Sequence, residues 1–166
     1  MDDARVGAKG EAGHVSRGEG RMLWVLGDLY EFKAASEETH GAFATWETTV
    51  TPGLPGPPPH IHHREVESFY VLEGEVELSV AGRVIEAATG TFVNIPIGTL
   101  HTFRNPGTEP ARLLVSVVPG GFEKFFDEIG EPATDPGSPP AGPPDVEKVV
   151  AAAPKYGLEI PPPPSS

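Results

Sequence analysis

The sequence predicts an all-β fold, because it consists of many short apolar segments separated by turn residues. These segments fill residues 21–119 and are bounded by Gly, Pro, Asn and Asp. Val76, Leu78 and Val80 alternate with polar residues, which is the period of a strand with one buried face. Many short strands at close, even spacing are typical of an all-β sandwich or barrel.

Turn residues separate the strands that this pattern predicts. Gly27-Asp28 lies between the first two strands, and Gly74 lies at the turn of a hairpin. A stiff loop rich in Pro and Gly occupies Pro52–Pro59. The expected strands are Met22–Leu26, Leu29–Phe32, Phe43–Val50, Glu67–Leu72, Glu75–Val80, Arg83–Glu86, Phe92–Ile95, His101–Arg104 and Arg112–Val118.

A first helix is expected over Gly121–Ile129, directly after the last strand. Its apolar residues fall at helical spacing, so this helix would close one side of the β body. They are Phe122, Phe125, Phe126 and Ile129.

A second, shorter helix is expected over Asp145–Ala153, with Asp145 as N-cap and Pro154 ending it. Its valines at 146, 149 and 150 would share one face. A helix this short needs a surface to dock on, either its own barrel or a second subunit.

The domain organisation follows from composition. Residues 1–20 are rich in Gly and charge and are expected to be flexible, and residues 21–130 are expected to form the β-barrel domain. Eleven prolines fall between Pro132 and Pro164, which predicts a Pro-rich C-terminal arm over residues 131–166 with a short helix around 145–153.

Composition and charge exclude several classes of function. The 166 residues include no Cys, which removes disulfides, thiolate ligands and cysteine nucleophiles. The 24 acidic and 12 basic residues give a net charge of −12, which disfavours nucleic acids and anionic membranes as partners. The sequence shows neither an apolar stretch of membrane-spanning length nor a secretory signal at its start, so a cytoplasmic protein is expected.

The histidines indicate a metal site. His60 and His62 are two positions apart, so on a strand they share a face and can reach one point in space. Glu67 follows His62 by five positions, and a single regular strand would place it on the opposite face. It joins the two histidines only if the polar segment His63–Val66 turns the chain.

A fourth candidate ligand, His101, follows the turn signal Pro96-Ile97-Gly98. If its strand lies beside that of the first two histidines, three imidazoles and one carboxylate surround one centre. Such a donor set suits Fe, Mn, Ni, Co or Zn and leaves positions open for a ligand. We therefore predict one divalent metal ion at His60, His62, Glu67 and His101. The alternative is a metal-free barrel in which these groups hydrogen-bond a sugar or an acid.

The two blocks of residues resemble the two signature motifs of the cupin superfamily. PHIHHREVESFYVLEG contains HxH(x4)E(x6)G, which ends at Gly74, and GTFVNIPIGTLHTFRN contains G(x5)PxG(x2)H(x3)N, which runs from Gly90 to Asn105. The glycine usually placed ahead of the first histidine is off by one position if Gly53 is meant. The resemblance implies a cupin double-stranded β-helix, a jelly-roll barrel, with short C-terminal helices.

Within this superfamily the chain resembles the small single-domain cupins grouped with quercetin 2,3-dioxygenases. In those enzymes a divalent metal held by three His and one Glu opens the heterocyclic ring of a flavonol with O₂ and releases carbon monoxide. The resemblance makes His60, His62 and His101 ligands, and Glu67 both a ligand and the base that accepts the flavonol 3-OH proton. Burial in an apolar pocket is expected to raise the pKa of Glu67 and help it hold that proton. The resemblance also implies a homodimer.

Aromatic residues are candidates for a substrate pocket, although each alone is more often a residue of an ordinary β core. The candidates are Phe43, Trp46, Phe69, Phe92 and Phe103. Parity turns His63 away from His60 and His62, which makes it a turn or surface residue, or a residue that supports a ligand.

These observations predict a metal-dependent dioxygenase that acts with O₂ on a flavonol-like or enolisable aromatic substrate. Two alternatives stay open. The same metal could act as a Lewis acid in an isomerase, cyclase or hydrolase of natural-product metabolism that does not use O₂. The barrel could instead bind a small molecule without converting it.

Overall fold

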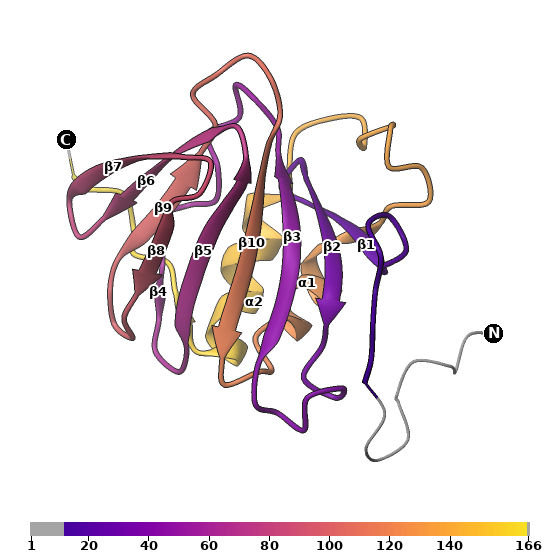
Figure 1. Ribbon diagram of the computed structural model, residues 1–166. Coiled ribbons are helices and arrows are strands. Elements are labelled where there is room, and N and C mark those ends of the chain that lie inside the picture. Colours follow the sequence, from indigo (N-terminus) through magenta and orange to yellow (C-terminus); the bar gives the residue numbers. More distant parts are fainter. Residues whose placement is uncertain (1–11, 166) are drawn as a thin grey trace.

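Two antiparallel β-sheets enclose the interior of the protein in a computed structural model that describes residues 12–165 (Figure 1). The larger sheet has the strand order β11-β1-β2-β3-β10-β5-β8, and the smaller one has the order β7-β6-β9. A bridge between His60 and His101 places the start of β4 beside β9, and β4 pairs with β12. The all-β prediction is confirmed.

Every strand that the sequence predicts is present, with ends that differ by up to two residues. The strands are β1 (Met22–Val25), β2 (Asp28–Ala34), β3 (Ala44–Val50), β4 (Ile61–His62), β5 (Val66–Glu73), β6 (Glu75–Val80), β7 (Arg83–Ala88), β8 (Phe92–Ile95), β9 (His101–Arg104), β10 (Ala111–Val118), β11 (Glu131–Pro132) and β12 (Leu158–Glu159). The two-residue strands β11 and β12 are not predicted, because each depends on a partner that is distant in sequence, whereas β4 corresponds to the strand expected at His60 and His62.

The core lies between the two sheets and continues under the helices. Val76 and Leu78 are fully buried, as their alternation predicts. Trp46 on β3 packs edge-on against Phe126, with ring centroids 5.1 Å apart. The same hydrophobic cluster includes Val149 from the C-terminal arm. The barrel and the helices therefore share one core.

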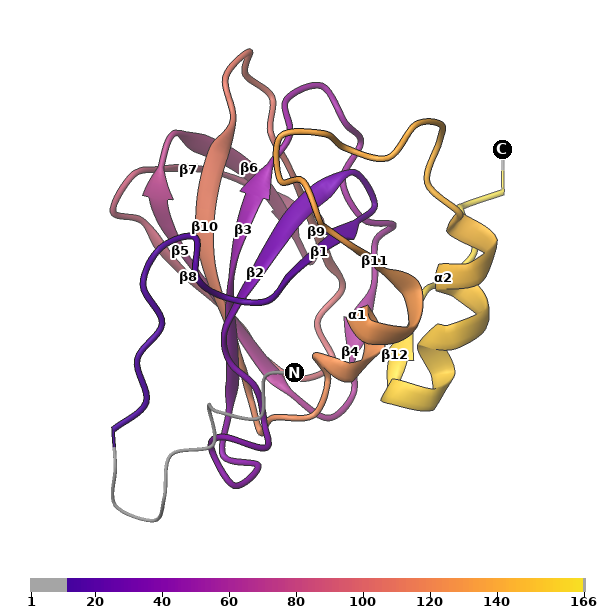
Figure 2. The ribbon, with the colours of Figure 1, turned by 90° about the vertical axis from the view of Figure 1, so that its right-hand side faces the viewer.

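Helix α1 (Lys124–Ile129) covers one side of the barrel, as predicted, but begins later than expected. The buried carboxylate of Glu123 accepts hydrogen bonds from the backbone N–H groups of Ser36 and Gly121, both at 2.7 Å, which fixes the start of the helix. Figure 2 shows α1 and α2 (Val146–Ala152) together on the same side of the barrel. None of the described helices is long and apolar enough to cross a membrane.

The helix of the C-terminal arm confirms its predicted N-cap and corrects one other detail. The Asp145 carboxylate accepts a hydrogen bond from the Lys148 backbone N–H at 3.0 Å. Val146 and Val150 are 47% and 46% exposed, and the buried residues of α2 are Val149 and Ala152. The expected shared valine face is therefore wrong.

The α-helix ends at Ala152, before Pro154, as predicted, and the chain continues as the 3₁₀ helix η1 (Ala153–Tyr156), whose first turn tolerates proline. Beyond η1 the arm returns to its own barrel as β12. Of the segment 1–20, for which the sequence predicts flexibility, residues 1–11 lie outside the described residues.

A buried carboxylate at the start of β2 makes the stability of this fold depend on pH. Asp28 is 3% exposed, and its Oδ1 accepts a hydrogen bond from the Thr51 N–H at 2.9 Å. Burial raises the pKa of Asp28 from 3.8 to about 7, and the bond from Thr51 offsets this only in part. An acid whose pKa is higher in the folded state makes folding less favourable as it ionises, here between pH 4 and pH 7.

We expect Asp28→Asn to remove this pH dependence while keeping an oxygen for the Thr51 N–H. The unfolding free energy of the variant minus that of the unmodified protein should increase by roughly 4 kcal/mol from pH 4 to pH 8. Urea unfolding at both pH values measures the difference. Asp135→Asn, on the exposed Pro-rich segment, is the control. A stability difference for Asp28→Asn that stays constant across this range would contradict the interpretation.

Candidate metal centre

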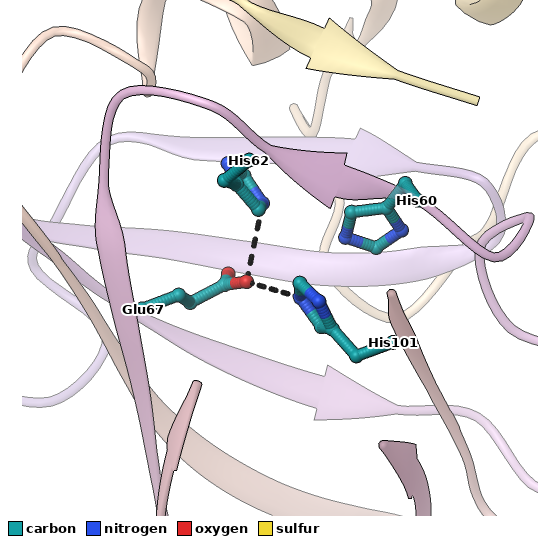
Figure 3. A group of neighbouring side chains, drawn as sticks. All are labelled: His60, His62, Glu67 and His101. Carbon is teal, nitrogen blue, oxygen red and sulfur yellow. Dashed lines mark hydrogen bonds and ion pairs between the residues drawn. The ribbon is translucent and has the colours of Figure 1, made fainter. Parts of the chain in front are cut away.

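Four side chains converge inside the barrel (Figure 3). His60 directly precedes β4, His62 lies on β4, Glu67 lies on β5, and His101 is the first residue of β9. One potential ligand atom from each lies within 4.8 Å of all the others, and all four residues are buried. The chain bends at residues 63–64, between β4 and β5, and this bend brings Glu67 to the histidines.

Backbone hydrogen bonds join the two sequence motifs to each other. His60 N donates to His101 O and His101 N donates to His60 O, both at 3.0 Å. Gly98, in the turn before β9, donates its N–H to His62 O at 2.9 Å. The expected adjacency of the two histidine strands is therefore confirmed, and the imidazoles are held by paired backbone rather than by a mobile loop.

The outward-facing nitrogen of each imidazole has an acceptor beside it. His60 Nδ1 lies 2.8 Å from Pro58 O, and His101 Nδ1 lies 2.9 Å from Thr99 O. A carbonyl oxygen only accepts, so each Nδ1 carries the proton and donates it. His62 Nδ1 lies 3.4 Å from Glu65 Oε2. This pattern leaves Nε2 of all three rings for the centre of the cluster.

Glu67 is the acidic residue that contacts two of the three imidazoles of the site. Its Oε2 lies 2.7 Å from His101 Nε2 and 3.2 Å from His62 Nε2. Burial raises the pKa of Glu67, but His62 and His101 outweigh burial and hold this pKa well below its usual range. The expectation of a raised pKa is therefore wrong, because it considered burial without the two imidazoles that face the carboxylate.

The histidines divide into two electrostatic classes. Burial lowers the pKa of His62, yet the carboxylates of Glu67 and Glu65 outweigh burial and raise this pKa to about 9. Burial, followed by the neighbouring His101, lowers the pKa of His60 to about 3. At neutral pH His60 is therefore a neutral imidazole beside an ionised carboxylate, which is the form in which both groups bind a cation.

The residues fit a divalent metal ion. Both ring nitrogens of His62 are buried, and neither makes a hydrogen bond of acceptable geometry. Such unpaired buried polar atoms are uncommon in proteins. A cation among the three Nε2 atoms and Glu67 would give His62 Nε2 its partner. Three imidazoles and one carboxylate suit late first-row divalent ions. The site could therefore bind a metal.

Glu65 is a site residue that sequence reasoning missed. It is 5% exposed, and its Oε2 points to His62 Nδ1 without a second partner. The sequence does indicate that Glu65 faces the site, because Glu65, Glu67 and Phe69 are two positions apart and so share one face of an extended chain. Interpreting the segment between His62 and Glu67 only as a polar turn concealed this position.

We expect Glu65→Gln to weaken metal binding by about 10- to 100-fold, the usual effect of removing the support of a ligating histidine. The amide oxygen can still accept from His62 Nδ1, but the negative charge that makes the ring a better ligand is lost. Competition with a chromogenic chelator for Zn²⁺ or Ni²⁺ measures the change. Glu75→Gln, an exposed position on β6, is the matched control. Equal affinities for the two variants would exclude this role for Glu65.

The cavity beside the centre contains three of the five predicted aromatic residues: Trp46, Phe69 and Phe103. Phe43 and Phe92 do not line it, since their side chains are 40% and 62% exposed. Phe43 precedes β3, and Phe92 lies on the outward face of β8. Assigning these two to the pocket is therefore wrong. Aromatic residues of the lining that were not proposed as pocket residues are Tyr30, Phe122, Phe125 and Phe126.

His63 points away from the centre, as its parity predicts. Its ring is half-exposed and its Nε2 lies 2.6 Å from Glu159 Oε2 on β12. It therefore belongs to the surface contact between β4 and the C-terminal arm and is not one of the converging ligand residues.

Comparison with known proteins identifies the same region. The family profile described as Cupin domain matches residues 46–117. Quercetin 2,3-dioxygenase from Bacillus subtilis is 31% identical over 123 residues, which are 71% of this chain and 34% of that protein. Quercetin 2,3-dioxygenase from Aspergillus japonicus is 31% identical over 123 residues, which are 69% of this chain and 34% of that protein. The chain thus spans about a third of the length of these two relatives.

A solved structure agrees with the fold. The polyketide cyclase RemF from Streptomyces resistomycificus superposes with a TM-score of 0.58 at 27% sequence identity, covering 65% of this chain and 80% of that one. The two motifs and the buried cluster of three histidines and one glutamate lie within residues 46–117, the region that matches the cupin domain. The chain therefore contains a cupin domain over residues 46–117, and it is similar to quercetin 2,3-dioxygenases.

Proposed function

We propose that the protein is a metal-dependent dioxygenase that oxidises a flavonol-like or enolisable aromatic substrate with O₂. The observation that carries this proposal is the convergence of three imidazoles and one carboxylate at the wall of a cavity lined by aromatic rings. The two relatives named quercetin 2,3-dioxygenase support it.

Different residues of the site would bind the metal and contact the substrate. His60, His62, Glu67 and His101 would hold the metal, which when bound supplies a Lewis acid for the substrate oxygen and a path for electrons to O₂. Trp46, Phe69 and Phe103 present ring faces and edges to a planar substrate and exclude water from it.

Glu67 is the group placed to accept the proton of an enolic hydroxyl. Its lowered pKa keeps it ionised at neutral pH, so a carboxylate oxygen is available as an acceptor. His62 and His101 fix its Oε2, which leaves Oε1 as the atom at which a substrate proton can arrive. Holding base and substrate together in a dry cavity is the condition for efficient general base catalysis.

The experiment is an oxygen-electrode assay with flavonols, run on metal-loaded protein. We expect O₂ uptake and carbon monoxide release in equal amounts, with no conversion of the flavonol under nitrogen. Conversion at the same rate without O₂ would exclude the dioxygenase, and recovery of intact flavonol from a tight complex would indicate a binding protein.

A second candidate function is a metal-dependent cyclisation or isomerisation of an aromatic polyketide-like molecule. It is favoured by the alignment with RemF, because this chain covers 80% of that cyclase but only about a third of the two dioxygenases. Conversion of such a substrate under nitrogen would support it.

A further inference from the structure

Residues 145–160 of the C-terminal arm form one wall of the metal cavity. Val149 of α2, Leu158 of β12 and Ile160 line the same cavity as His60, His62 and Glu67. All three arm residues lie outside the region 46–117 that matches the cupin domain. This wall is therefore contributed by residues outside the matched region.

The arm is seated on the strand that carries the histidines. Leu158 pairs with His62 and Glu159 pairs with Ile61 in the β12·β4 ladder, and His63 N donates to Gly157 O at 2.9 Å. Figure 2 shows β12 next to β4, with α2 outside α1. The position of the arm is thus tied directly to the metal-bearing strand.

The cavity is small, so its walls decide what it admits. Its volume is about 40 Å³. Its other walls come from strands, such as β10 between β3 and β5, from loops and from aromatic residues at α1. The arm wall is held by a two-residue ladder, by the hydrogen bond from His63 N, by contacts of Lys155 and Tyr156 with Glu128, and by side-chain packing.

A larger hollow lies on the other side of this wall, under Pro139–Pro144, with about 390 Å³ for water-sized molecules. Leu26, Ile129 and Val149 line both this outer hollow and the metal cavity. The two spaces are therefore neighbours that meet at these three side chains. Val149 is the one that the arm contributes, and it is 4% exposed.

We propose that the arm determines which substrates the cavity accepts, with Val149 as the principal specificity-determining residue. A smaller residue at 149 joins the metal cavity to the outer hollow and makes room for a larger ring system, whereas a larger residue separates the two spaces further. The proposal rests on the proposed function, because it takes a planar aromatic molecule as the occupant.

Binding of two probes to the full-length protein tests it without requiring turnover. The probes are 2-naphthol, with two fused rings, and quercetin, with three rings, and binding is followed by quenching of tryptophan fluorescence because Trp46 lines the cavity. We expect Val149→Ala to shift the ratio of the two Kd values about tenfold in favour of quercetin, and Val149→Leu to shift it in the opposite direction.

Val150→Ala is the matched control, since Val150 is the next residue on the same helix and is 46% exposed. Its ratio of Kd values should stay within about twofold of the unmodified protein, the scale of an exposed substitution. If Val149→Ala does not fold, Ile160→Ala is a second variant that removes side-chain volume from the cavity wall, because Ile160 is half-buried there. It should also shift the ratio of Kd values in favour of quercetin.

The proposal is overturned if Val149→Ala and Val149→Leu move the ratio in the same direction, if Val150→Ala matches Val149→Ala, or if neither probe binds. A dioxygenase assay of the same samples separates the two ideas. Opposite shifts in the Kd ratio without O₂ uptake would reject the proposed function and support the role of the arm. O₂ uptake with unchanged Kd ratios would support the proposed function and reject the role of the arm.

Discussion

Replacing His101 by alanine should abolish stoichiometric metal binding. His101 is 1% exposed, and its Nε2 faces the centre of the cluster at 2.7 Å from Glu67 Oε2. Among the described residues the cluster holds no histidine beyond His60 and His62, which are themselves candidate ligands, so none can take its place. Loss of a supporting residue alone weakens metal sites by about 10- to 100-fold, so loss of a ligand should lower affinity by more than about 100-fold. Elemental analysis of protein dialysed after purification measures the content, which should fall from about one ion per chain to near zero.

His63→Ala is the control that separates a ligand from an ordinary surface histidine. His63 lies in the same HIHH run, but its half-exposed ring contacts Glu159 instead of the cluster. The metal content of this variant should equal that of the unmodified protein. Unchanged metal content in a double variant, His60→Ala with His101→Ala, would show that the metal lies elsewhere or that the protein binds none.

The sequence predicts the ligand cluster because simple parity and turn rules govern it. His60 and His62 share a face by their spacing, and the bend at residues 63–64 brings Glu67 to them. The adjacency of the two motifs was a condition in the prediction, and the paired hydrogen bonds between His60 and His101 satisfy it. Local pattern is sufficient here because the ligands lie on or beside short strands.

The pocket lining is harder to predict, because it depends on which face of a strand turns inward and on contacts distant in sequence. Phe92 starts a strand whose inward residues are Val93 and Ile95, so one step of register separates a pocket residue from a surface residue. Val149 reaches the cavity through contacts that are distant in sequence, of α2 with α1 and of β12 with β4, and no local pattern encodes them.

The pKa of Glu67 shows a third limit of sequence reasoning. Burial alone raises the pKa of a carboxyl group, but two imidazoles at 2.7 and 3.2 Å outweigh it. The sign of the shift therefore depends on distances between side chains from three strands. A sequence identifies the groups but not the balance between their desolvation and their mutual attraction.

Glu67→Gln should be the most damaging substitution for turnover that leaves the shape of the site intact. The amide cannot accept a proton at neutral pH, so the rate with saturating metal should fall by about 10²- to 10⁴-fold, the usual contribution of a general base. The neutral side chain should also bind the cation less tightly, and each measurement therefore needs metal in excess. Initial rates of O₂ uptake with quercetin, at metal concentrations that saturate the variant, measure the effect.

Glu67→Asp distinguishes loss of the base from loss of the ligand charge. It keeps the carboxylate but withdraws it by one methylene, so metal affinity should recover more completely than the rate, because proton transfer requires close approach to the substrate hydroxyl. The control is Glu77→Gln, on β6, whose carboxylate pairs with Arg104 outside the cluster and whose loss should leave the rate unchanged. A Glu67→Gln variant that retains about a tenth or more of the rate with saturating metal would exclude Glu67 as the proton acceptor and confine its role to holding the metal.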